Sequence, residues 1–484
     1  MSVIVNVKDR GVIADGVTIV SPDVQRIVDE LAACGGGTVL FSAGQYVLAT
    51  VMLKSNIRIE LEKGAVLLGA LNASDYRPAE PLDFPLYQDA SHCYFEPSMF
   101  AAIDCDNVAI VGPGLIDMRS VWDPEDAKDC SYRAAKPIAF KNCKNVEFAD
   151  FRIENATDLA VYFAGCENVD IHGLSMRVYI DGISPDNSKQ VRIRDCDIEA
   201  GDDGIVLKSS YTLNRTDVCK DIDIRNCRIK TRCNALKFGT ESNGGFINIH
   251  AENLEIYDTR ISAIALESVD GALIENVTVK NVTMINVNGP IFIHIGRRMR
   301  GPKHLEIGQI RNITLENITV KGPYKPYDIV PCYYWTWQQN DWRQYPWYYE
   351  GIHKSLTCEA DVENPSEDNA EGLIWQFTSN ICGLPESHLE NITLRNIQME
   401  LDGGVQEYAT DVPEDPQTYP EIFTYGRVLP AKGIFFRYLD GLTLDNVTVR
   451  TYRPDARPDF EFRGVTNLTR SVAPDFASET VKMK

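Results

Sequence analysis

Three aspartates at two places in the chain have the residue type and the spacing to perform acid–base chemistry. Asp181 precedes the adjacent pair Asp202 and Asp203 by 21 residues, about one turn of a repeat built from stacked strands. Neighbouring strands lie about 4.8 Å apart, so one such turn would bring the three carboxylates onto one face. Because like charges raise the pKa of one member of such a group, the cluster could hold a protonated acid beside an ionised base. Hydrolysis of a glycosidic bond requires that pair, and an acidic surface turn or a calcium site is the alternative.

Composition and charge narrow the class of protein. The chain has 484 residues, 44% of them hydrophobic, which suffices for one large repeat domain or for two or three ordinary domains. A net charge of −21 argues against nucleic-acid and anionic-membrane partners, and it disfavours a long polyanionic substrate unless a local basic patch receives it. No apolar stretch is long enough to span a bilayer, and no signal peptide is visible after Met1. We therefore expect a cytoplasmic protein, with a trimmed secreted or periplasmic protein as the alternative.

The 13 cysteines follow the strand pattern and do not form a metal-binding pattern. Cys143, Cys166, Cys196 and Cys227 each lie at the same place in a local motif, just before or within a predicted strand. Cysteine packs as a small hydrophobic residue, so this placement indicates stacked interior thiols. No pair of cysteines has zinc-ligand spacing with a matching second pair. We predict structural thiols in a reducing compartment, with disulfides as the alternative, and neither a metal nor a cofactor.

Short β-branched runs recur along the chain with a polar residue, most often asparagine, before or between them. From Val146 to Val277 the spacing between runs is about 22 to 31 residues, which is typical of a solenoid. The runs alternate with a period of two, as strands do, and no amphipathic helix lies between them. The sequence therefore predicts an all-β fold, a right-handed parallel β-helix that forms a single domain over 1–484. The asparagines of the Asn-x-Thr runs are expected to be turn residues, with glycosylation as the alternative.

Two parts of the chain depart from the repeat. Residues 5–80 are expected to form an N-terminal cap and the first coils. Ser21 resembles a helix N-cap with Pro22 at the first helical position, and the helix would stop at Gly35. Its apolar face would be Val24, Ile27, Val28 and Leu31. Residues 322–388 contain five of the six tryptophans and predict an inserted lobe with a small core of its own. The alternative is that some of these aromatics stack on sugar rings.

Several short motifs occur in order along the chain. They are Asp15-Gly16, Gly35-Gly36-Gly37, Gly44-Gln45-Tyr46, Leu53-Lys54-Ser55-Asn56, Gly64-Ala65, Asp186-Asn187-Ser188-Lys189 and Gly201-Asp202-Asp203. Together these motifs resemble one known family, glycoside hydrolase family 28, the polygalacturonases and their relatives. The resemblance covers about residues 5 to 320 and extends more loosely to the last coils.

This resemblance implies a fold, an activity and roles for the aspartates. Members of the family are parallel β-helices that cleave an oligosaccharide substrate with inversion at the anomeric carbon. Asp202 would be the general acid, and Asp181 and Asp203 would hold and activate the water. Inverting enzymes usually keep their carboxyl groups about 6.5–9.5 Å apart, and three carboxylates on two coils could supply that separation.

Two family motifs are altered here. Cys233-Asn234-Ala235 stands where polygalacturonases carry Gly-His-Gly, so an amide that cannot carry charge replaces a histidine. Ala265-Leu266-Glu267 stands where they carry Arg-Ile-Lys, and a buried glutamate would repel a galacturonate carboxylate. We expect a neutral sugar in at least one subsite, with Glu267 accepting hydrogen bonds from its hydroxyls. The alternative is that Glu267 only pairs with Lys237 or Arg260.

Further side chains are candidates for sugar binding. Glu241 lies in a glycine-bordered stretch, 238–245, that resembles the Gly-Ser-Glu-Met-Ser-Gly-Gly segment of bacterial exo-acting members. This stretch, and a lobe that blocks one end of the groove, favour exo action. The remaining candidates are basic or imidazole groups, each of which could instead be a solvated or structurally paired side chain: Lys208, Lys237, Arg260, His294, and Arg297 with the neighbouring Arg298 and Arg300.

Two other functions remain open from the sequence. A carbohydrate-binding β-helix with a decayed site would not require all three aspartates, so their presence argues against it. A lyase or epimerase would need a base next to a uronate, usually with calcium or a Lys/Arg pair. The absence of cations at Ala265 and Glu267 disfavours that second alternative.

Overall fold

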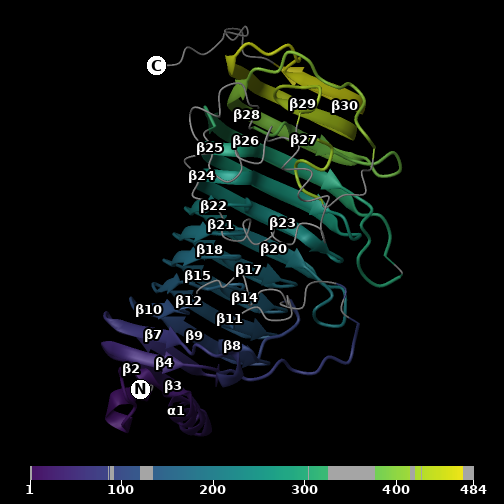
Figure 1. Cartoon of the computed structure of the whole chain (residues 1–484). Coiled ribbons are helices and arrows are strands. Elements are labelled where there is room, and N and C mark those ends of the chain that lie inside the picture. The colour runs from purple at the N-terminus through teal and green to yellow at the C-terminus, as the bar shows by residue number, and fades with distance from the viewer. Residues whose placement is uncertain are drawn as a thin grey trace. The chain divides into compact units, whose positions relative to one another are not determined.

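The computed structural model describes residues 3–85, 87, 92–119, 135–303, 305–324, 376–414, 420–426 and 428–471. The chain divides into two compact units, Met1–Cys227 and Arg228–Lys484, and strands are the predominant elements among the described residues of each (Figure 1). Most of the predicted aromatic lobe lies outside the described residues. No helix in the described part of the chain combines the length and hydropathy that a membrane crossing requires.

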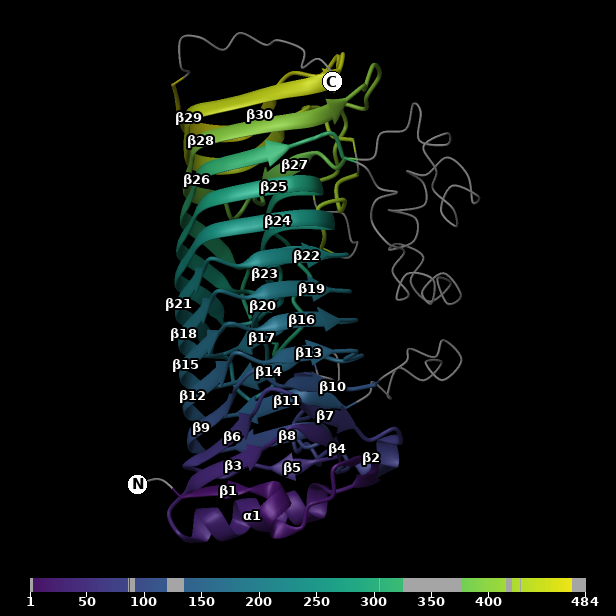
Figure 2. The ribbon, with the colours of Figure 1, turned by 90° about the vertical axis from the view of Figure 1, so that its left-hand side faces the viewer.

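The first unit is a parallel β-helix with three columns of paired strands (Figure 2). Alternate side chains point inward, as in β6, where Ile57, Ile59 and Leu61 have no exposed surface. The first column consists of β1 (Ile4–Asn6), β3 (Gly37–Phe41), β6 (Ile57–Leu61), β9 (Asp106–Val111), β12 (Lys144–Ala149), β15 (Glu167–His172), β18 (Lys189–Arg194) and β21 (Val218–Arg225).

The other two columns pair in the same parallel way. The second consists of β2 (Asp15–Ile19), β4 (Gly44–Leu48), β7 (Ala65–Gly69), β10 (Leu115–Asp117), β13 (Arg152–Glu154), β16 (Ser175–Val178) and β19 (Asp197–Ala200). The third consists of β5 (Val51–Met52), β8 (Ser98–Ile103), β11 (Lys136–Lys141), β14 (Val161–Ala164), β17 (Ile183–Asp186) and β20 (Ile205–Ser209). The aspartate motifs lie just before β17 and β20 of this third column.

The second unit continues the same parallel pairing with longer strands. β24 pairs with β25 from Gly245–Leu273 to Ser268–Ile295, so each strand follows most of a coil. Figure 2 shows the stack from β24 to β30. Its strands are β22 (Arg228–Thr231), β23 (Asn234–Ser242), β24 (Gly245–Ser268), β25 (Leu273–Ile295), β26 (Gln309–Lys321), β27 (Ser379–Cys382), β28 (Leu389–Gly403), β29 (Ile434–Arg453) and β30 (Phe460–Ser471).

Asparagines at the corners join neighbouring coils. Asn276, Asn312 and Asn391 have φ values of 57°, 57° and 55°, a left-handed conformation that asparagine tolerates. Their side-chain amides form a ladder with donor–acceptor distances of 3.1 Å, from Asn391 to Asn312, to Asn276 and on to Asn248. The prediction that the Asn-x-Thr asparagines are turn residues is confirmed.

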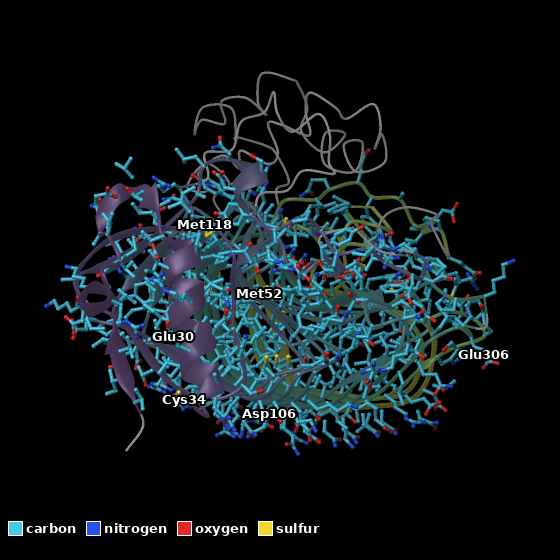
Figure 3. All side chains as sticks on the ribbon, turned by 90° about the horizontal axis from the view of Figure 1, so that it is seen from below. Glu30, Cys34, Met52, Asp106, Met118 and Glu306 are labelled. Carbon is cyan, nitrogen blue, oxygen red and sulfur yellow. The ribbon has the colours of Figure 1, made fainter. Side chains whose placement is uncertain are left out.

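A helix lies at the predicted place near the N-terminus. α1 (Ser21–Ala33) buries Val24, Ile27, Val28 and Leu31, the predicted apolar face. Ser21 is the first helical residue and not the N-cap, and its Oγ instead accepts a hydrogen bond from Ala49 N (2.6 Å). Figure 3 shows the helix with Glu30 and Cys34 along it and Met52 beside it. Two short 3-10 helices, η1 (Val7–Arg10) and η2 (Ala73–Asp75), complete the elements.

The described cysteines behave as packing residues. All ten are free, and all except Cys34 are buried. Burial raises the pKa of the Cys219 thiol, which suppresses the reactive thiolate. The structure therefore agrees with the prediction of interior thiols for these residues.

Candidate active site

The three aspartates meet in the first unit, as the spacing predicted. Asp181 lies just before β17, and Asp202 and Asp203 lie just before β20. The amide of Gly182 donates to Asp203 O (3.0 Å), which stacks the two segments in neighbouring coils, and Asp203 N donates to Asp181 Oδ1 (3.4 Å). One carboxylate oxygen from each aspartate lies within 4.8 Å of the other two. Asp181 and Asp203 are buried, whereas Asp202 is half-buried.

Glycines permit this close approach of the two coils. A Cβ at Gly201 would lie 2.2 Å from the carbonyl oxygen of Tyr179, and one at Gly182 would lie 2.6 Å from that of Gly204. Both obstacles are backbone atoms that cannot move aside. Each glycine is adjacent in sequence to an aspartate of the cluster, so backbone contact between the coils positions the carboxylates.

A buried lysine supplies positive charge to the cluster. Lys208, on β20, places Nζ 3.4 Å from Asp181 Oδ2, and both side chains are about 5% exposed. The hydroxyl of Ser184 donates to the same oxygen (3.3 Å). Lys208 was expected to bind substrate, and the structure places it against a carboxylate of the cluster.

The carboxylates of the cluster approach one another closely. One oxygen from each lies within 4.8 Å of the other two, whereas the carboxyl groups of inverting enzymes are usually about 6.5–9.5 Å apart. Hydrogen bonds between oxygens are about 2.7–2.8 Å long, so one water could bind two of these carboxylates at once. The cluster can therefore hold a single water directly.

A second buried carboxyl group lies beside this cluster. Asp186, at the end of β17, has no exposed surface and is in register with Lys208. Its oxygens accept hydrogen bonds from Tyr162 OH (3.1 Å), from Ser210 N (2.9 Å) and from the Ser210 hydroxyl. Burial raises the pKa of Asp186 from 3.8 to about 6, against the opposing effect of these donors.

This carboxyl group should make stability depend on pH. Between about pH 4 and 6 the folded protein keeps the Asp186 proton, whereas the unfolded chain has released it. The contribution of this group to the free energy of unfolding is therefore fully present below about pH 4 and is lost as the pH rises through about 6. The difference corresponds to about 3 kcal/mol. We expect Asp186→Asn to remove this loss, which urea unfolding at the two pH values would measure. An equal change in both proteins would contradict the expectation.

The second unit contains its own buried charged cluster. Lys237, on β23, places Nζ 2.8 Å from Glu421 Oε1 and 3.8 Å from Glu267 Oε1. The amide of Asn234 donates to the same oxygen of Glu421 (3.3 Å). The three predicted residues Asn234, Lys237 and Glu267 thus lie together, and Glu421 is an additional member that the sequence did not indicate.

Burial distinguishes Glu267 from its neighbours. Glu267 has no exposed surface, whereas Lys237 and Glu421 are each 3% exposed. A side chain without exposed surface cannot touch a sugar in this conformation, so the arrangement favours the alternative in which Glu267 pairs with Lys237. Its role as a direct acceptor of sugar hydroxyls stays a prediction. Arg260, the other suggested partner, lies half-buried on β24.

The basic run after β25 is paired with acidic side chains. Arg297 forms two hydrogen bonds of 2.7 Å to Glu386. Arg298 binds Asp270, with Nε 2.9 Å from Oδ1, and Arg300 binds the buried Glu241. These pairs account for the positions of Glu241 and of all three arginines, and binding of sugar by these residues stays a prediction.

His294 is held as a neutral group. Its Nδ1 lies 2.9 Å from the hydroxyl of Tyr425, and its ring stacks on Phe292 with centroids 5.5 Å apart. Burial, with a smaller effect from the positive Arg437, lowers the pKa of His294 to about 3. The imidazole therefore cannot supply positive charge near neutral pH, and it can act only as a hydrogen-bonding group.

The sequence did not indicate Glu421 and Tyr425, because both lie in 420–426, between two strands and outside the repeat. They reach Asn234, Lys237 and His294 across 131 to 187 residues of sequence. The one local signal is a short apolar and aromatic stretch, Ile422 to Tyr425, that follows no strand period.

Comparison with known proteins gives a consistent assignment. Residues 48–341 match the model of glycosyl hydrolases family 28. A probable polygalacturonase of Vitis vinifera is 25% identical over 295 residues, 57% of this chain and 60% of the relative. An exo-poly-alpha-D-galacturonosidase of Dickeya chrysanthemi is 22% identical over 306 residues, 52% and 50%. The chain thus spans half to three fifths of the length of these curated relatives.

Solved structures show the same fold. An exopolygalacturonase of Thermotoga maritima aligns with a TM-score of 0.62 and 20% identity, covering 82% of this chain and 87% of that one. A family 28 exopolygalacturonase of Yersinia enterocolitica gives 0.64 and 20%, with 98% and 79% covered. At this identity the likeness establishes the fold alone. The family match, however, extends over more than half of the chain, and the protein therefore belongs to glycosyl hydrolases family 28.

Proposed function

We propose that this protein hydrolyses glycosidic bonds in pectic or related plant cell-wall oligosaccharides. The observation that carries the proposal is the cluster of Asp181, Asp202 and Asp203, whose nearest oxygens lie within 4.8 Å of one another. Family membership and the polygalacturonase relatives support the substrate class. Binding alone would not require three carboxylates so close together, because their mutual repulsion costs free energy.

Each aspartate has a distinct part in the proposed reaction. Asp202, the most exposed of the three, donates its proton to the leaving glycosidic oxygen as the bond to the anomeric carbon breaks. Asp181 and Asp203 bind one water, which attacks that carbon and gives up a proton to them. Lys208, 3.4 Å from Asp181, holds that carboxylate in place.

We further propose exo action, with a neutral sugar in at least one subsite. The name of the Dickeya chrysanthemi relative and the resemblance of the stretch 238–245, which contains Glu241, support exo action. The neutral sugar is supported by Glu267, which stands where the family carries a lysine, and by the pairing of Lys237 with Glu421.

A product screen tests this function. Defined pectic oligosaccharides and aryl glycosides are incubated with the full chain and followed over time by chromatography. We expect release of a monosaccharide from one chain end. Products of mixed length would contradict exo action, unsaturated products would indicate a lyase, and no cleavage of any substrate would contradict the proposed function.

The stereochemical course gives a separate prediction. We expect inversion, because a water held by Asp181 and Asp203 attacks the anomeric carbon directly. Proton NMR of the first-formed product should show the anomer opposite to the substrate linkage. The close spacing of the carboxylates makes this test informative, because about 5–5.5 Å is usual for retaining enzymes. A retained anomer or a trapped glycosyl-enzyme would contradict the assignment and make Asp203 or Glu267 a candidate nucleophile.

A further inference from the structure

A short segment of the second unit covers the buried charged cluster. Residues 420–426, named here the strap, lie between β28 and β29 and are buried from Pro420 to Tyr425. They lie beyond 48–341, the part of the chain that matches the family model. The strap is therefore an element of this chain outside the matched family core.

The strap has anchors that do not involve Glu421. Asn380 Nδ2 donates to the carbonyl of Ile422 (2.9 Å), and the Ile422 side chain fills the space above Gly289, where a Cβ would lie 2.6 Å from Ile422 Cδ1. Tyr425 bonds to His294 (2.9 Å), and its ring lies 4.6 Å below the guanidinium of Arg437. These contacts hold the strap in place without using the carboxylate of Glu421.

That carboxylate determines the charge around Lys237. Glu421 Oε1 accepts hydrogen bonds from both Lys237 Nζ (2.8 Å) and Asn234 Nδ2 (3.3 Å). Glu267 Oε1 also lies 3.8 Å from this ammonium, so two carboxylates face the one lysine. A buried ammonium that is already paired has little attraction left for a further carboxylate, and the two glutamates would repel it.

We propose that Glu421 is a specificity-determining residue that selects a neutral sugar over a uronate. By holding Lys237, it withdraws the cation that a substrate carboxylate would need. It also leaves the amide of Asn234 oriented toward the same oxygen. Glu421 and Lys237 are each 3% exposed and Glu267 has no exposed surface, so Glu421 is the more accessible of the two glutamates. The inference rests on the proposed function, because it concerns the sugar that this function would accept.

Two sugars that differ in one group provide the test. D-galactose and D-galacturonate differ only at C6, and ligand-observed NMR titration measures their weak binding to the full chain without requiring hydrolysis. We expect wild-type protein to prefer galactose. Glu421→Gln keeps the shape of the side chain and removes its negative charge. It should shift the ratio of the two dissociation constants at least tenfold toward galacturonate.

Matched variants separate specificity from structure. Tyr425→Phe removes a strap anchor without changing charge, and it should leave the ratio unchanged. Glu267→Gln makes the same charge change on the other carboxylate, so it should shift the ratio in the same direction. This variant replaces Glu421→Gln in the test if Glu421→Gln fails to fold. Lys237→Met combined with Glu421→Gln should abolish the gain in galacturonate binding.

The outcomes distinguish this inference from the proposed function. An unchanged ratio in both glutamine variants would overturn it, as would a wild-type preference for galacturonate or a failure of both sugars to bind. Failure of the product screen would contradict hydrolysis but would leave these binding ratios measurable.

Discussion

Asp202→Asn is expected to lower kcat by about 10²–10⁴-fold while leaving substrate binding and Tm nearly unchanged. The reason is that asparagine keeps the size of the side chain but has no acidic proton to give to the leaving oxygen. Asp202 is half-buried, whereas Asp181 and Asp203 are buried, so the substitution disturbs the packed interior least at this position. Initial rates on an unactivated oligosaccharide, together with thermal unfolding, would measure both parts.

The same substitution elsewhere provides the control. Asp223, on β21, pairs with Arg225 (2.7 Å) outside the cluster, and Asp223→Asn should keep the wild-type rate. If Asp202→Asn retains more than a tenth of the wild-type rate, Asp202 is not the general acid. A large fall in Tm would show that the residue is structural.

Lys208→Met should have the largest effect on stability. It removes one partner of a buried ion pair and leaves Asp181 without the ammonium 3.4 Å away, which typically costs about 3–5 kcal/mol of unfolding free energy. We also expect turnover near neutral pH to fall about a hundredfold. An uncompensated Asp181 would bind a proton more readily and would hold the attacking water less well. Urea unfolding and initial rates measure the two effects.

An exposed pair gives the matched comparison. Lys189 pairs with Asp217 (2.9 Å), and its side chain is 42% exposed. Lys189→Met should therefore change the unfolding free energy by less than about 1 kcal/mol and should not affect turnover. Equal effects of the two substitutions would contradict the special role of Lys208.

The parts of the structure that local sequence encodes were predictable. The alternating strands, the corner asparagines and the helix near the N-terminus follow from short-range periodicity. The juxtaposition of Asp181 with Asp202 and Asp203 follows from the length of one coil. The predicted N-cap at Ser21 was wrong because a tertiary contact with Ala49 uses its hydroxyl.

The features that the sequence did not predict depend on contacts between segments that are distant in the chain. Glu421 lies 184 residues from Lys237, and no repeat or motif relates the two positions. The close approach of the carboxylates also depends on backbone contact between the coils at Gly182 and Gly201, which the length of one coil does not specify. Burial of Glu267 also depends on packing that a sequence pattern does not specify.

The central claim is that the aspartate cluster adds water across a glycosidic bond. The most direct test is cleavage in water labelled with oxygen-18, using the oligosaccharide identified by the product screen, with wild-type protein and Asp202→Asn compared by mass spectrometry. We expect one labelled oxygen per cleaved bond, at the new anomeric hydroxyl, and almost no product from Asp202→Asn. Unlabelled, unsaturated products, or labelled product formed equally by both proteins, would contradict it.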